Sequence, residues 1–210
     1  LLASKIGLSR SDRVLDLGAG PAHLSLRLAP FVGEVVVMDP EQAMLEEGRR
    51  RTAVAKLDNL SFVLGGSDDL AGLSPGLGTF GAVTISQAFH WMADQDRVLR
   101  ELDHLVEERG AVAIVGYVKE PDYNLVWLDR SPWNVVMEIL RRHLAGVPEG
   151  PRPAGRHDPF PELLARSAFS AVELLTNEYE AFVHPSIDAA VGYLSSVGGL
   201  VALLGERRAR

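Results

Sequence analysis

The sequence predicts an α/β protein built on a doubly wound, mainly parallel sheet, and three observations favour this class. Short apolar runs rich in β-branched residues alternate with longer segments of helical periodicity, which is the pattern of repeated βαβ units. The runs are apolar almost throughout, as expected for strands that helices cover on both faces. A glycine-rich turn follows the first run, at the end of the sheet where proteins of this class bind ligands.

The individual elements follow from these runs in chain order. We expect five strands, at residues 14–17, 35–38, 60–64, 82–85 and 111–115. The periodicity between them predicts helices over residues 22–29, 40–55 and 94–108, the second with Pro40 at its first position. The stretch from the third strand to Thr79 is rich in Gly, Ser, Asp and Pro, so we expect a loop there.

The alternation ends after Tyr117. Residues 119–161 contain many prolines and several aromatic residues, with one expected helix from Ser131 and Pro132 to Gly146. This pattern predicts an inserted helical lid that separates a core over residues 1–118 from a final part over residues 162–210. The final part is expected to hold strands at 172–175 and 179–183 and a C-terminal helix, all within one domain of residues 1–210.

Composition narrows the possible partners. The formal net charge of −7 argues against nucleic acid, whose phosphates need a positive surface. No apolar run approaches the roughly 20 residues that a membrane-spanning helix needs, and the start carries no export signal. Cysteine is absent, which excludes disulfides and thiolate chemistry. We therefore expect a cytoplasmic monomer or homodimer, and the start at Leu1 leaves open that the chain is part of a longer protein.

The turn after the first strand reads Asp16-Leu17-Gly18-Ala19-Gly20. Glycines here let the backbone approach a ligand closely, because no Cβ stands in the way. The dinucleotide-binding pattern has a third glycine, but His23 stands at its position, which argues against a pyrophosphate. The carboxylate of Asp16 suits a ligand with positive charge, such as the ammonium and sulfonium of S-adenosylmethionine. The alternative is that Asp16 only braces the loop.

A second acid, Asp39, ends the second strand. An acid at this position accepts hydrogen bonds from ribose hydroxyls in nucleoside-binding proteins. Asp39 therefore predicts a nucleoside ligand without choosing between S-adenosylmethionine and a dinucleotide. Two alternatives stay open, an NAD-dependent oxidoreductase and a non-catalytic nucleoside-binding domain.

Three segments together resemble a known family. Residues Val14–Ala29 and Val35–Leu45 resemble the first two motifs of class I S-adenosylmethionine-dependent methyltransferases. The string SQAFHW, from Ser86 to Trp91, resembles the fourth motif of the small-molecule, type 11-like group that includes trans-aconitate methyltransferases. The resemblance covers about residues 5–118 and, more loosely, 160–198. It implies a Rossmann-like methyltransferase sheet whose first 118 residues bind S-adenosylmethionine and release S-adenosylhomocysteine.

The resemblance also assigns the cofactor contacts. Gly18 and Gly20 would face the methionine part of the cofactor, with Asp16 near its ammonium group, directly or through water. Ser86 and Gln87 would close the pocket beneath the methionine.

On the nucleoside side, the resemblance places Asp39 on the ribose and Pro40 and Met44 near the adenine. The loop that contains Ser67 and Asp68 matches the adenine-binding stretch, where Asp68 would accept from the adenine amino group. This loop departs from the commoner Gly-Asp-Ala opening of the family.

His90 is the candidate catalytic residue. Methyl transfer from a sulfonium is an in-line displacement, so positioning lowers much of the barrier. A hydroxyl acceptor needs a general base, whereas a carboxylate acceptor is already a nucleophile, and we expect one of these two oxygens. His90 follows a central strand, and imidazole has an ordinary pKa near 6.5 that suits proton transfer at neutral pH. The alternative is that His90 and Trp91 only form a wall of the pocket.

Aromatic residues are expected to bind the small-molecule acceptor, because they bury large areas with few rotatable bonds. They are Trp91, Tyr117, Tyr123, Trp127 and Trp133. The alternative for Trp127 and Trp133 is a role as core anchors of the inserted helix. The histidines show no pair with the spacing of a metal site, so no metal is expected.

Overall fold

The computed structural model describes residues 2–116, 160–169, 171–173 and 175. The chain forms two compact units, Leu1–Leu140 with Pro153–Val172 and Arg141–Arg152 with Glu173–Arg210. The helices and strands described below belong to the first unit. The division into a core, a lid and a final part of one domain stays a prediction.

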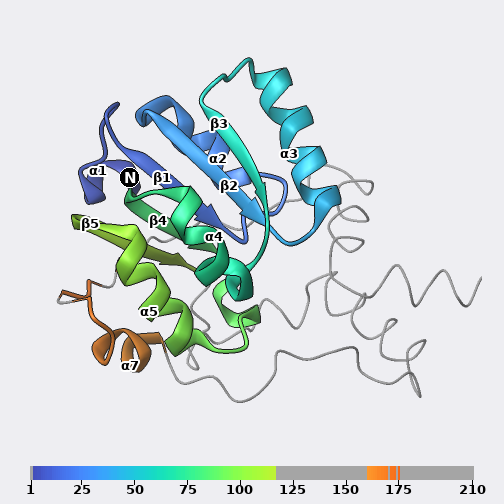
Figure 1. Ribbon diagram of the computed structural model, residues 1–210. Helices are drawn as coiled ribbons and strands as arrows, with labels where there is room; N and C mark the ends of the chain where they lie inside the picture. The colour runs from blue at the N-terminus through green and yellow to red at the C-terminus, as the bar shows by residue number, and fades with distance from the viewer. Residues whose placement is uncertain (1, 117–159, 170, 174, 176–210) are drawn as a thin grey trace, which may run out of the picture. The chain divides into compact units, whose positions relative to one another are not determined.

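Five parallel strands form one sheet in the order β3-β2-β1-β4-β5 (Figure 1). They are β1 (Arg13–Leu17), β2 (Glu34–Asp39), β3 (Leu60–Leu64), β4 (Phe80–Ser86) and β5 (Val106–Val115). All five predicted strands and the doubly wound parallel class are confirmed. The order of the strands reverses between β1 and β4, and such a switch point opens a crevice for ligands at the carboxyl ends of the strands.

Helices cover both faces of the sheet, and the residues of β1 alternate between them. Val14 belongs to one apolar core, whereas Leu15 and Leu17 belong to the other, because successive side chains of a strand point to opposite faces. The core of Val14 includes residues of α1 (Leu2–Ile6), α2 (His23–Leu28) and α3 (Gln42–Ala55). The core of Leu15 includes residues of α4 (Leu70–Leu77), α5 (Gln95–Leu105) and α7 (Phe160–Ala165), and Figure 1 shows α4 and α5 in front of the sheet.

Helix α4 corrects the prediction of a loop up to Thr79. Its sequence contains Pro75 and two glycines, but Leu70 and Leu77 are buried against the sheet, and their burial outweighs the poor helix propensity. Pro75 cannot donate to the carbonyl of Ala71, four residues earlier. The hydroxyl of Ser74 donates to that oxygen at 3.3 Å, so the carbonyl still has a partner.

The predicted start of α3 at Pro40 is wrong. The helix begins at Gln42, and Glu41 precedes it with an extended backbone. The reason is the carboxylate of Asp39, whose Oδ1 accepts from the amide of Glu41 at 2.9 Å. This contact holds the chain in a turn at Pro40, so the helix cannot start there.

The third predicted helix is shorter than expected, and the strand after it is longer. Helix α5 ends at Leu105, and β5 begins at once at Val106, which pairs with Phe80. The register then shifts, so that the next pair is Ala82 with Ala111. Gly110 makes this irregularity possible, because a Cβ there would lie 2.6 Å from the Val106 side chain and 2.9 Å from a backbone oxygen.

Helix α7 was not expected from the sequence, and the first late strand, predicted at 172–175, is not seen at the described residues of that stretch. Val172, Glu173 and Leu175 lie outside any strand, since an apolar pattern alone provides no pairing partner. The other predictions for the C-terminal half, the helix over 131–146, the strand at 179–183 and the last helix, lie outside the described residues.

Candidate functional site

The loop after β1 takes a backbone shape that glycine favours. Gly18 and Gly20 have φ angles of +70° and +54°, and Ala22 has a φ of +62°. The amides of Gly18 and Ala19 donate to the carbonyl of Met38 at 2.8 and 3.1 Å, which fixes the loop to the end of β2. A Cβ on Gly20 would meet no atom within 4 Å, so the backbone there borders open space. A ligand can therefore approach the main chain at Gly20.

Asp39 ties this loop to the end of β2. Its side chain is nearly buried, and its Oδ2 accepts from the amide of Gly20 at 2.7 Å while its Oδ1 accepts from Glu41. Each carboxylate oxygen has a second lone pair, so the group keeps capacity for further donors. The structure brings together Asp39 and Gly20, which the sequence assigned to one cofactor.

Asp16 lies fully buried below the loop, on the face that packs against α2. Its Oδ2 accepts from the hydroxyl of Ser25 at 2.5 Å and its Oδ1 from the hydroxyl of Thr84 at 2.8 Å. Burial raises the pKa of Asp16, and the two hydroxyl donors oppose this rise. The carboxylate therefore braces α2 and β4 in this structure, and its predicted role at the ammonium group stays a prediction.

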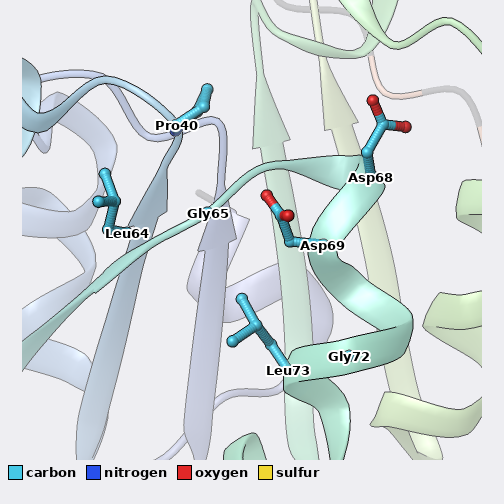
Figure 2. Close-up of a pocket in the computed structure, with 7 residues that line it drawn as sticks. All are labelled: Pro40, Leu64, Gly65, Asp68, Asp69, Gly72 and Leu73. Atoms are coloured by element: carbon cyan, nitrogen blue, oxygen red, sulfur yellow. The ribbon is translucent and has the colours of Figure 1, made fainter.

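A hollow of about 640 Å³ lies beside the ends of β2 and β3 (Figure 2). It is lined by Pro40, Leu64, Gly65, Asp68, Asp69, Gly72 and Leu73. Pro40 and Asp68 were predicted adenine contacts, and both line it. Met44 and Ser67 are not among its lining residues, and Met44 lies partly exposed on the first turn of α3.

The two acids of the hollow have different surroundings. Asp69 accepts from the amide of Gly66 at 2.8 Å through its Oδ2. In Figure 2 the carboxylate of Asp69 points toward Gly65, and that of Asp68 points away from it. Within the described chain, only the backbone oxygen of Asp68 has a hydrogen bond, from Arg97 at 3.3 Å. The Asp68 carboxylate is thus available to an outside donor.

The turn after β4 meets the loop after β1 at the switch point. Ser86 ends β4, and Gln87 follows with a φ of +55°, an uncommon angle for a residue with a side chain. Ala88 lies so close to Gly18 that a Cβ on Gly18 would be 2.5 Å from the Ala88 Cβ. The segments that the sequence assigned to the cofactor and to catalysis are therefore in contact.

The end of this turn, Phe89–Trp91, forms one turn of 3-10 helix. Phe89 is buried, whereas Trp91 is 60% exposed, and the rings of His90 and Trp91 lie 5.2 Å apart between centroids. This places the candidate catalytic residue and one candidate acceptor contact side by side. Tyr117, Tyr123, Trp127 and Trp133, the other predicted acceptor contacts, lie outside the described residues.

A charged cluster fixes the first residue of α2. The Nη1 of Arg51 lies 3.0 Å from the Nδ1 of His23 and 3.1 Å from its Nε2. Burial and the positive charges of Arg51 and Arg27 lower the pKa of His23. Glu47 accepts from Arg50 and Arg51, and these contacts lower its pKa to about 2. The cluster joins α3 to α2 next to the glycine loop.

Sequence reasoning missed Ser25, Thr84, Ala88 and Gln95. The hydroxyls of Ser25 in α2 and Thr84 in β4 donate to the carboxylate of Asp16, and the amide of Gln95 donates to the Phe89 carbonyl at 2.8 Å. One signal was present for Ala88, a small residue inside the SQAFHW string. Thr84 could be found only once the pairing of β1 with β4 is known, whereas Ser25 lies in α2 and not in a paired strand.

The described residues also bear on metal and membrane binding. They contain no group of three or more His, Asp or Glu side chains that could hold a metal ion. None of the described helices has both the length and the apolar character required to cross a membrane.

The sequence matches known proteins over the same part of the chain that forms the sheet. Residues 14–110 match a family of methyltransferase domains. The uncharacterized methyltransferase YcgJ of Bacillus subtilis is 26% identical over 110 residues, which are 52% of this chain and 42% of YcgJ. The ubiquinone/menaquinone biosynthesis C-methyltransferase UbiE of Escherichia coli is 27% identical over 117 residues, 54% of this chain and 45% of UbiE. The match thus spans less than half the length of these curated relatives.

Solved structures show the same fold. The structure of YcgJ from Bacillus subtilis superposes with a TM-score of 0.50 at 23% identity, covering 67% of this chain and 56% of that one. A Bacillus halodurans protein assigned to the methyltransferases superposes with a TM-score of 0.56 at 21% identity, covering 82% of this chain and 68% of that one.

Fold and sequence match identify residues 14–110 as a methyltransferase domain with a Rossmann-like sheet. This segment, less than half of the chain, is similar to class I S-adenosylmethionine-dependent methyltransferase domains, whose cofactor is S-adenosylmethionine. The match favours this class over the dinucleotide-dependent alternative. The resemblance to trans-aconitate methyltransferases in particular stays a prediction.

Proposed function

We propose that the protein transfers the methyl group of S-adenosylmethionine to a hydroxyl or carboxylate oxygen of a small molecule. The observation that carries the proposal is the contact of Gly18 with Ala88 at the switch point. It sets the glycine loop and Asp39 beside the turn that bears His90 and Trp91. Cofactor-type and acceptor-type residues thus follow the carboxyl ends of the neighbouring strands β1 and β4.

The residues present fit the cofactor. The open space at Gly20 admits a ligand against the main chain, Asp39 has lone pairs for ribose hydroxyls, and Asp68 offers a carboxylate to an adenine amino group. Asp16 has no exposed surface, so it would act on a positive charge through the loop above it. When bound, the cofactor supplies an electrophilic methyl group on its sulfonium.

Two roles remain for His90. As a general base it would accept the proton of a hydroxyl acceptor at a ring nitrogen, while Trp91 excludes water. As a pocket wall it would only orient the acceptor. Replacing His90 by Ala separates the roles: loss of a base lowers kcat by about 10²–10⁴-fold, whereas loss of a wall raises KM. Unchanged turnover with intact binding would eliminate the base.

Calorimetry tests the proposal at the level of the ligand. We expect S-adenosylhomocysteine to bind the full chain and NAD to give no heat. Binding of NAD alone would favour an oxidoreductase. Binding of S-adenosylhomocysteine without turnover on any acceptor would favour a non-catalytic nucleoside-binding domain, and binding of neither ligand would refute both enzyme proposals.

A mass-shift screen of small hydroxy acids and carboxylic acids addresses the acceptor. We expect methyl esters or methyl ethers among the products. The Escherichia coli relative is named a C-methyltransferase, so the panel should include activated carbon acids. Methylation of those alone would contradict the proposed oxygen acceptor.

The location and assembly are also proposals. The sequence favours a cytoplasmic protein that is a monomer or homodimer and binds no nucleic acid. Cell fractionation and light scattering of the full chain test the first two points, and a mobility-shift assay with duplex DNA tests the third.

A further inference from the structure

The turn that carries His90 and Trp91 is held from outside by one residue of α7. The ring of Phe160 packs edge-to-face against the buried ring of Phe89, with centroids 5.2 Å apart and planes at 69°. Phe89 immediately precedes His90, so its position determines where the backbone of His90 and Trp91 lies. Aromatic pairs of this geometry favour one relative orientation beyond the area they bury.

A second contact fixes the main chain of the same turn. The side chain of Gln95 is buried, and its Nε2 donates to the carbonyl of Phe89 at 2.8 Å. The amide of Met92 donates to that same carbonyl at 3.2 Å. Gln95 is the first residue of α5, whose N-terminus Asp94 caps by accepting from the amide of Arg97. The backbone of Phe89 is thus bound to α5, and the ring of Phe89 packs against α7.

Helix α7 is itself attached to α5. The guanidinium of Arg166 donates from Nε and Nη2 to both carboxylate oxygens of Asp96, at 2.8 and 2.7 Å. Both side chains are nearly half exposed, so the pair contributes geometry more than stability. Leu163 of the same helix is buried in the core below. The Arg166–Asp96 pair therefore attaches the helix that carries Phe160 to α5.

The same turn also contacts the end of β5. The amide of Gln87 donates to the carbonyl of Val115 at 2.8 Å, and Phe89 two residues later contacts Phe160. Ala88, between these two contacts, lies against Gly18 in the loop after β1.

We infer that Phe160 is a positioning residue for the acceptor side of the site, which acts on His90 and Trp91 through Phe89. The inference rests on the proposed function for the role of those two residues. It adds a residue that lies outside the segment matched to the methyltransferase family, which ends at residue 110. Among the described residues, the contact that links its ring to the turn is the one with Phe89.

The test compares four variants of the full chain. Phe160→Ala removes the ring, Phe160→Leu keeps most of the apolar volume, and Phe160→Tyr keeps the ring. Leu163→Ala is the matched control, because it removes buried apolar surface from the same helix and leaves the ring pair in place. The primary readout is the indole N–H signal of Trp91 in NMR spectra, assigned with Trp91→Phe.

We expect Phe160→Ala and Phe160→Leu to shift the Trp91 signal, and Phe160→Tyr and Leu163→Ala to leave it near its wild-type position. With an active acceptor, the first two variants should lower kcat/KM by about twofold to tenfold, the range that an aromatic pair accounts for. The Tyr variant should restore it.

An unchanged Trp91 signal in Phe160→Leu, or an equal shift in Leu163→Ala, would overturn the inference. The NMR readout needs neither cofactor nor acceptor. Failure of S-adenosylhomocysteine to bind would therefore refute the proposed function while leaving the position of the turn measurable.

Discussion

Replacing Gly18 by Ala tests the contact on which the proposed site depends. A Cβ at this position would lie 2.5 Å from the Ala88 Cβ, well inside van der Waals contact, at a φ of +70°. The positive φ alone costs about 1–2 kcal/mol for a residue with a Cβ. Overpacking adds about 1–3 kcal/mol, so we expect Gly18→Ala to lower the free energy of unfolding by about 2–5 kcal/mol.

Gly20→Ala is the matched control, because it has a similar φ of +54° but no atom within 4 Å of the added Cβ. It should cost only the backbone term, about 1–2 kcal/mol. Its methyl would nevertheless fill the space at the main chain that the cofactor needs. We therefore expect Gly20→Ala to weaken S-adenosylhomocysteine binding at least about tenfold, a change of about 1.4 kcal/mol.

The steric part can be isolated with a double-mutant cycle. Ala88→Gly removes the atom that the new methyl would meet, so the double variant should recover about 1–3 kcal/mol relative to the sum of the two single variants. Urea unfolding of the full chain at neutral pH provides the four free energies. A coupling energy below about 0.5 kcal/mol, or equal losses in Gly18→Ala and Gly20→Ala, would refute the argument that the two loops touch here.

Three further predictions concern charge and backbone strain. Burial raises the pKa of Asp16 above its ordinary 3.8, so the stability linked to this group is full below pH 3.8 and is lost as the pH rises through the folded-state pKa. Asp16→Asn should remove this pH dependence from urea midpoints measured between pH 4 and 7, and it should also weaken S-adenosylhomocysteine binding. An unchanged pH dependence would contradict a raised pKa of Asp16. Burial and Arg51 lower the pKa of His23 below 6.5, so stability should fall as the pH drops from 6.5 through the folded-state pKa, and His23→Gln should flatten the decline. Lys56 ends α3 with a φ of +55°, so Lys56→Gly should raise the free energy of unfolding by about 0.5–1 kcal/mol, whereas Lys56→Ala, which keeps the strain, should not.

The strands could be predicted because their signal is local. Val35–Met38 is a buried apolar run and Leu60–Leu64 a partly buried, mostly apolar run, and both can be recognised without knowledge of the partner strand. Helix α4 was missed for the opposite reason: its local signal, from Pro75 and the glycines, opposes a helix, and contacts of Leu70 and Leu77 with the sheet decide the outcome. The start of α3 was misplaced because a side chain, Asp39, binds the backbone that the helix would otherwise use.

The candidate site could be predicted as a set of residues but not as an arrangement. The order Asp16, Gly18, Gly20 and Asp39 along the chain indicated a nucleoside site. That Asp39 accepts from the amide of Gly20 depends on the pairing of β1 with β2, which places the two loops side by side. No local pattern contains that information.

The surroundings of Asp16 show which part of its role the sequence alone cannot predict. Thr84 is 68 positions away in sequence, and it supplies a hydrogen bond because it is the register partner of Asp16 between β1 and β4. A carboxylate at this place fits either a charged ligand or a structural brace as long as the neighbouring strand is unknown. Once the register is fixed, both oxygens have hydroxyl donors, so the brace exists whether or not a cofactor binds. The two roles can therefore coexist, and Asp16→Asn distinguishes them, since a hydroxyl can reverse and accept from the new amide, whereas a positive ligand loses a buried countercharge below the loop.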